Sequence, residues 1–282
     1  MRRRIWLRAA ALALALAAVI AGLTAYFSSA SVPPCLVSGT PTWHPPTDGS
    51  PKRFAVVFPD HAACFFAIGG KQALVGQLRL TGATDVSTAA PNADRIAVRT
   101  SSGPYTLDVG SGKLTKGGLA PFDHGTLTVT DAERQRMYVT QRGLLGFRVI
   151  DVRTGATIQV VHFKGFTWNP RFGPNPPSHG LVLRPDRPEL WVLDAPNHAL
   201  HVFDVSAAPR PIADVRLERT LTTPGSLTES ADGRYLYVGD AGDVIDTQTR
   251  TSIANLDALQ QATAVLEVDW VDGRAVFPGF PR

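Results

Sequence analysis

Short apolar runs that follow a polar turn recur along the chain at nearly regular distances. They occupy residues 95–98, 136–139, 189–192, 235–238 and 274–277, and their last residues lie 41, 53, 46 and 39 positions apart. A second run follows each of the first four and contains Asp108, Asp151, Asp204 or Asp246. Both runs are rich in β-branched and aromatic residues and are bounded by glycine-containing turns. This pattern is typical of strands joined by hairpins.

No segment after Phe27 sustains the 3.6-residue apolar period of a full helix, so we expect an all-β body. A repeat of about 40 residues with about four strands predicts the blades of a β-propeller, because an isolated four-stranded sheet cannot bury both faces. We expect six blades, at 52–81, 84–116, 124–163, 178–217, 225–257 and from 264 onward. Seven blades are the alternative, if the N-terminal part holds a degenerate repeat.

The last expected blade has room for only about two strands, so another part of the chain must complete it. Residues 35–46 are the candidates, because pairing them with the C-terminal strands would leave no open sheet edge.

Two of the repeats resemble a known family. Residues 226–246 contain Ala-Asp-Gly-Arg-Tyr-Leu-Tyr-Val and then Val-Ile-Asp, and residues 179–205 contain Arg-Pro-Asp, Leu-Trp-Val and Val-Phe-Asp. These segments resemble the YVTN-type β-propeller repeat, which is also seen in surface-layer proteins and in propeller subunits of periplasmic dehydrogenases. The resemblance covers residues 85–282. It implies a propeller fold and leaves the activity open, because such folds host many functions.

The N-terminal segment is typical of an exported or membrane-anchored protein. Four arginines precede an uncharged run over residues 9–27, close to the ~20 residues that a membrane-spanning helix needs. The segment is either retained as an anchor or cleaved after Ala30, where Ser28 and Ala30 are small. Arg3 and Arg4 also resemble a twin-arginine export signal, although a simple cluster of positive charge explains them as well. We therefore expect residues 1–30 to be a signal peptide or anchor and residues 31–282 to be a propeller in the periplasm or at the cell surface.

The charge of the body argues against nucleic-acid binding. Four of the 28 basic residues lie in the leader, which leaves 24 basic residues against 24 acidic ones. A neutral body lacks the basic footprint that binding to phosphate backbones requires.

Cys35 and Cys64 are the two cysteines, and both follow the leader. In an oxidising compartment they would form a disulfide that pins the start of the body to the first blade. The alternative is a pair of buried free thiols.

Catalytic motifs are absent from the sequence. There is no Gly-x-Ser-x-Gly elbow, His-Glu-x-x-His helix, Cys-x-x-Cys pair or phosphate loop, so we predict no cofactor, no metal and no catalytic residue. The repeated aspartates are expected to accept backbone N–H groups in hairpin turns.

Two histidines are candidates for a site on the propeller axis. His124 and His179 each precede a glycine at the expected start of an innermost strand, where both imidazoles would face the central channel. Hydrogen-bonded channel lining is the alternative interpretation. His198 and His201 are expected to be surface residues.

An insertion of about ten residues over 163–177 lengthens the spacing between the third and fourth repeats. It carries Phe166, Trp168 and Phe172 among several prolines. Aromatic side chains on a stiff loop can contact a ligand or partner at low entropic cost, whereas folding back on the blade edge is the alternative. Together with His124 and His179 these residues form the predicted ligand site.

These observations predict a non-catalytic binding or scaffold module for a protein or small-molecule ligand. The alternative is an enzyme or enzyme subunit that resembles propeller lactonases or the dehydrogenase subunits, with His124 and His179 near the chemistry.

Overall fold

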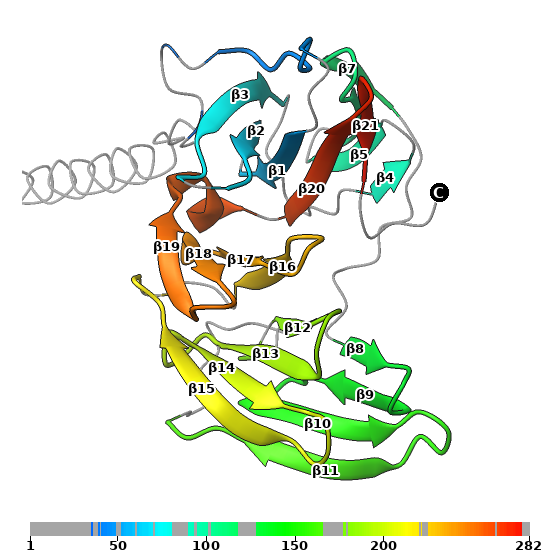
Figure 1. Ribbon diagram of the computed structural model, residues 1–282, viewed down its shortest axis with the longest axis vertical. Coiled ribbons are helices and arrows are strands. Elements are labelled where there is room, and N and C mark those ends of the chain that lie inside the picture. The colour runs from blue at the N-terminus through cyan, green and yellow to red at the C-terminus, as the bar shows by residue number, and fades with distance from the viewer. Residues whose placement is uncertain are drawn as a thin grey trace, which may run out of the picture. The chain divides into compact units, whose positions relative to one another are not determined.

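A computed structural model describes residues 35, 39, 41–48, 52–59, 61–69, 71–80, 90–92, 95–100, 103–117, 128–165, 177–178, 180–219, 221, 225–262 and 264–277. The chain divides into Met1–Val32 and Pro33–Arg282, and all of these residues belong to the second unit. They form strands and one short 3₁₀ helix, η2 (Asp257–Gln261), so the expected all-β class is confirmed (Figure 1). None of their helices is long and apolar enough to cross a membrane. The expected leader, residues 1–30, lies outside the described residues.

The strands form five antiparallel sheets within the described part of the chain. Sheet A has the order β21 (Arg274–Val276), β20 (Ala264–Val271), β1 (Lys52–Phe58), β2 (Ala62–Ala67) and β3 (Leu74–Arg79). Sheet B contains β4 (Ala90–Asn92), β5 (Arg95–Thr100), β6 (Gly103–Asp108) and β7 (Lys113–Lys116). Sheet C contains β8 (Thr128–Asp131), β9 (Arg136–Val139), β10 (Gly146–Asp151) and β11 (Thr157–His162). Sheet D contains β12 (Leu181–Leu183), β13 (Glu189–Asp194), β14 (Ala199–Asp204) and β15 (Arg210–Arg216), and sheet E contains β16 (Ser226–Glu229), β17 (Tyr235–Gly239), β18 (Asp243–Asp246) and β19 (Thr251–Asn255).

The repeated aspartates close the last hairpin of sheets B to E. In each turn a carboxylate oxygen accepts a backbone N–H from two or three residues ahead, as in the 2.8 Å bond from Thr154 to Asp151. Such a bond holds the chain in the turn and satisfies a donor that the strands leave unpaired. Hydrogen bonds from Ser206 lower the pKa of Asp204 to about 2. The aspartates therefore accept backbone N–H groups in the turns, as expected from the sequence.

The C-terminal strands do not form a sixth blade. β20 pairs with β1 along its whole length, from Lys52 opposite Trp270 to Phe58 opposite Ala264. The reason is that β1 offers an open edge on the side away from β2, and the apolar face of β20 continues the face of sheet A. The expectation of a separate blade from residue 264 was therefore wrong.

The expected partner of those C-terminal strands was also wrong. Residues 41–43, part of the 35–46 segment, follow β3 instead: Trp43 donates its N–H to Gln77 at 2.9 Å, and Gln77 donates to Pro41 at 3.0 Å. Trp43 stacks on Phe65 with ring centroids 4.0 Å apart and donates its indole N–H to the carbonyl of Val109, which directly follows β6 of sheet B. This segment therefore joins sheet A to sheet B.

A disulfide bond joins Cys35 to Cys64, with their Cα atoms 6.0 Å apart. Both side chains are buried, and Cys64 lies in the middle of β2. The bond ties the start of the body to sheet A.

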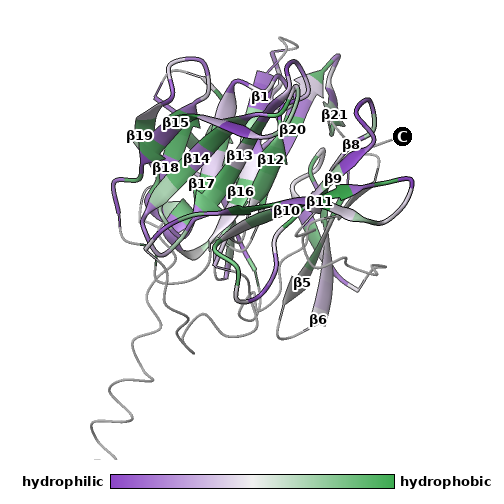
Figure 2. Ribbon diagram, turned by 90° about the horizontal axis from the view of Figure 1, so that it is seen from below, coloured by the Kyte–Doolittle hydropathy of each residue, from purple (hydrophilic) through white to green (hydrophobic). Residues whose placement is uncertain are grey.

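Neighbouring sheets bury their apolar faces against each other. The hydrophobic residues lie along the strands, and hydrophilic ones gather in the turns (Figure 2). Four buried clusters join sheet A to B around Phe54 and Ile96, A to E around Val57 and Val244, D to E around Trp191 and Leu236, and C to D around Phe147 and Phe203. Each four-stranded sheet thus depends on its neighbours for burial.

The closure of sheet A predicts a contrast between two valines of β20. Val268 is fully buried in the core between sheets A and B, whereas Val271 is 39% exposed. We expect Val268→Ala to lower the free energy of unfolding by about 2 kcal/mol, through lost burial and a residual cavity. Val271→Ala should cost about 0.5 kcal/mol or less. Urea unfolding of both variants checks this, and equal losses would contradict the different burial of the two side chains.

Candidate functional site

The residues predicted to form the ligand site, His124, His179, Phe166, Trp168 and Phe172, all lie outside the described residues. The structure does describe both ends of the insertion, at 163–165 and 177–178. It therefore shows how the insertion is attached to the sheets.

Both ends of the insertion are attached to the β13–β14 turn of sheet D. The carbonyl of Lys164 accepts a 2.8 Å hydrogen bond from the side-chain amide of Asn197. The carbonyl of Pro177 accepts the backbone N–H of Ala195 at 3.2 Å. One short turn thus fixes where the insertion leaves the sheets and where it returns.

Asp194 holds this turn in place through hydrogen bonds to Asn197. Its side chain is fully buried, and its two oxygens accept the backbone N–H and the side-chain amide of Asn197 at 3.0 and 2.8 Å. The same carboxylate lies 2.9 Å from Nε2 of His201, whose Nδ1 lies 2.6 Å from Asp214 on β15. A buried carboxylate is stable only when it is this fully bonded.

His201 is not the surface residue that the sequence suggested, because its side chain is only 20% exposed. Burial by itself lowers the pKa of the imidazole, but the hydrogen bonds to Asp194 and Asp214 outweigh burial and raise it overall. The ring also contacts Phe163, with centroids 4.2 Å apart. The first residue of the insertion thus packs on a histidine held between two carboxylates. Sequence spacing gave no signal of this contact, because it joins residues from four different segments.

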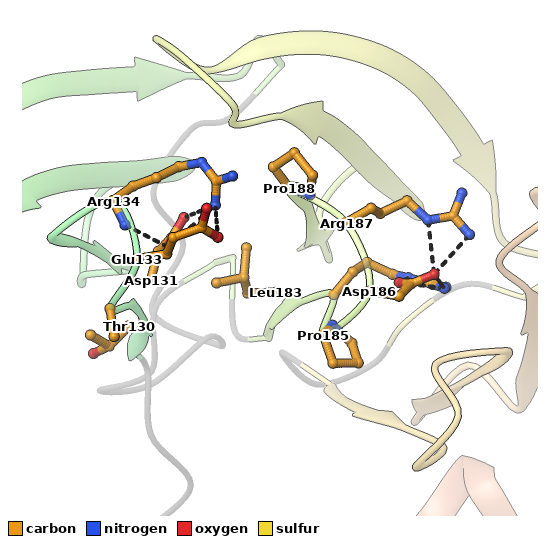
Figure 3. A pocket seen from close by; sticks show the side chains of 11 residues that line it. Thr130, Asp131, Glu133, Arg134, Leu183, Pro185, Asp186, Arg187 and Pro188 are labelled. Atoms are coloured by element: carbon orange, nitrogen blue, oxygen red, sulfur yellow. Dashed lines mark hydrogen bonds and ion pairs between the residues drawn. The ribbon is translucent and has the colours of Figure 1, made fainter.

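A cavity of about 420 Å³ lies at the opposite ends of the same strands (Figure 3). One wall is the β8–β9 turn of sheet C, residues 130–134, and the other is the β12–β13 connection of sheet D, residues 183–188. Sequence reasoning missed this cavity, because charged residues in short turns look like an ordinary solvated surface.

The charged side chains of the cavity form two groups. In the sheet C wall, Nη1 of Arg134 lies 3.2 Å from Asp131 and 3.2 Å from Glu133. In the sheet D wall, Asp186 pairs with Arg184 at 2.9 Å and with Arg187 at 3.2 Å. The three positive and three negative groups cancel, so the cavity has no net formal charge.

Arg184 ties the sheet D wall to sheet E. Its side chain is 2% exposed and donates to the carbonyl of Gly233 and the hydroxyl of Thr247. It also lies 3.5 Å from Glu229. A guanidinium presents a rigid fork of donors, so one buried arginine can hold several groups of a neighbouring sheet in place.

Among the residues that the structure describes, no group of three or more histidine, cysteine, aspartate or glutamate side chains is arranged to hold a metal ion.

Comparisons with known proteins give distant structural matches. No protein-family model matches the chain, and no curated protein matches it. Among solved structures, it is similar to a protein from Lactobacillus plantarum at 18% identity, over 72% of this chain and 65% of that one, with a TM-score of 0.37. It is also similar to the Myceliophteria thermophila Cps50 (Swd1) β-propeller domain at 13% identity, over 79% and 77%, with a TM-score of 0.35. The dihydro-heme d1 dehydrogenase NirN matches at 13% identity, over 85% and 72%, with a TM-score of 0.36.

The ion pair between Arg184 and Glu229 lies behind the sheet D wall of the cavity, and it predicts that the stability of the protein depends on pH. Burial raises the pKa of Glu229 from 4.5 to about 7, although the charge of Arg184 opposes the shift. Between these values the unfolded chain has lost the proton that the folded protein keeps, so the free energy of unfolding falls as pH rises. We expect Glu229→Gln to remove part of the fall between about pH 5 and about pH 8.

Chemical unfolding across this pH range measures the effect. Asp272→Asn is the matched control, because Asp272 is an exposed carboxylate. A wild-type protein whose stability rises over the range, or a Glu229→Gln variant with an unchanged profile, would contradict the assignment.

Proposed function

We propose that this chain is a β-propeller binding module that acts outside the cytoplasm and catalyses no reaction itself. It holds a protein or small-molecule ligand through the insertion between sheets C and D. Its leader either anchors it to the membrane or is removed on export. The leader sequence, the repeat pattern and the stacked four-stranded sheets support this proposal.

The attachment of the insertion is the observation that carries the proposal. Both ends are bonded to a single turn, and that turn is held by the buried Asp194. Fixing both ends of a loop lowers the conformational entropy that is left to lose on binding, which favours affinity. Phe163 already packs between His201 and Phe203, so the insertion starts from a rigid base.

The enzyme alternative rests on His124 and His179, which both lie outside the described residues, and it stays a prediction.

Loss of the insertion should abolish binding of the ligand or partner and leave the sheets folded. We expect deletion of residues 166–172 to remove the retained partner, and Trp168→Ala to reduce capture about tenfold, because buried aromatic anchors dominate binding. The measurement is quantitative mass spectrometry of what the immobilised protein retains from the extracytoplasmic fraction of its host. Circular dichroism checks that each variant is folded.

Asn197→Ala tests the attachment itself. It removes the amide that holds Lys164, so we expect weaker capture even though every insertion residue is present. Asn255→Ala is the matched control, since its side-chain amide holds the carbonyl of Ala241 in sheet E. Equal capture by the wild type, the deletion and Asn197→Ala would refute this proposal.

A further inference from the structure

The cavity between sheets C and D is built before any ligand arrives. On the sheet C side, Asp131 accepts the backbone N–H of Arg134 at 3.0 Å, and this bond closes the turn. On the sheet D side, backbone bonds between Arg184 and Glu189, at 2.9 Å, and between Glu189 and Arg187, at 2.7 Å, fix the connection. Prolines at 185 and 188 restrict this connection further. A volume of about 420 Å³ falls in the usual range of ligand pockets.

The formal charges of the cavity lining sum to zero. Its three arginines and three carboxylates cancel, so neither an anion nor a cation gains a net Coulomb attraction. An anion would meet the exposed carboxylates of Glu133 and Asp186, and a cation would meet Arg134 and Arg187. The lining therefore favours a ligand with no net charge.

Hydrogen-bonding groups remain available on both walls. Arg134 bonds Asp131 and Glu133 through Nη1 alone. Its Nε and Nη2 have no partner among the described residues. Arg187 bonds Asp186 through Nε and Nη2, and its Nη1 has no partner among the described residues. On the sheet C wall the donors of Arg134 lie beside the carboxylate of Glu133, so a hydroxyl group can accept from one and donate to the other. On the sheet D wall Arg187 offers a donor, while both oxygens of Asp186 already accept from Arg184 and Arg187.

Apolar surface separates the two charged groups. Leu183 and Pro188 lie between the Arg134 group and the Arg187 group, with Pro185 below them in the same view (Figure 3). These side chains offer C–H surface to the ring of a sugar, whose hydroxyls would reach the charged groups on either side. A peptide fits less well, because its N–H and C=O groups each serve only as donor or only as acceptor.

We propose that this cavity is a second binding site, for a short stretch of neutral oligosaccharide. It lies at the opposite strand ends from the insertion, so it is spatially separate from the partner site proposed above.

Binding of defined trisaccharides tests the proposal on the whole exported protein. Isothermal titration calorimetry would use maltotriose, cellotriose, mannotriose and triacetylchitotriose, with trigalacturonate as the anionic probe and triglycine as the peptide probe. We expect at least one neutral trisaccharide to bind with a dissociation constant of about 1 mM or tighter, and the two other probes to bind at least about tenfold more weakly. Failure of all four neutral sugars, or tighter binding of trigalacturonate or triglycine, would overturn the proposal.

Substitutions of cavity residues test whether the sugar binds in the cavity. Arg134→Gln, Glu133→Gln and Arg187→Gln each remove one charged hydrogen-bonding group, and each should weaken binding about tenfold. Arg219→Gln is the matched control, because Arg219 forms an exposed 3.1 Å ion pair with Asp257 away from the cavity. Thermal unfolding identifies any variant that fails to fold. The binding affinities of the cavity variants that do fold then test the site. Wild-type affinity in the folded cavity variants would show that the sugar binds elsewhere and would refute the site.

Discussion

The packing of sheet C against sheet D is the contact on which both proposed sites depend. Its core is a group of aromatic rings, with Phe147 and Phe203 5.1 Å apart in an edge-to-face arrangement and Phe163 stacked on Phe203. One end of this interface carries the root of the insertion, and the other end carries the charged cavity. Since each site takes one part from each sheet, neither keeps its geometry if the two sheets separate.

Buried polar groups fix the ends of the sheets that the apolar core holds together. Asp194 holds the turn beneath the insertion, and Arg184 connects the cavity wall to sheet E. The buried carboxylate of Glu267 on β20 makes a similar link from sheet A, because it accepts the backbone N–H of Ala231 in the β16–β17 turn of sheet E at 2.5 Å. Such groups are costly to bury, so they fit only where every partner is in position, and they therefore favour one arrangement of neighbouring sheets.

The sequence predicted the local structure better than the long-range pairing. Apolar runs and turn aspartates such as Asp151 identified most strands, because these signals act within a few residues. The pairing of β20 with β1 joins residues more than two hundred positions apart, and no periodicity records it. His201 was misread for the same reason: Asp194, Asp214 and Phe163 surround it only after three strands and the insertion come together. The charged turns of the cavity carry no pattern that separates a ligand site from a solvated surface.

Hydrogen–deuterium exchange of Phe203→Leu tests the dependence of both sites on the C–D core most directly. Removing part of this buried ring should loosen the core without deleting any polar contact. We predict faster exchange in both the 130–136 turn at the cavity and the 194–198 turn at the insertion, while exchange in sheet B is unchanged. Faster exchange at only one of these turns, or at neither, would contradict a shared structural origin of the two sites.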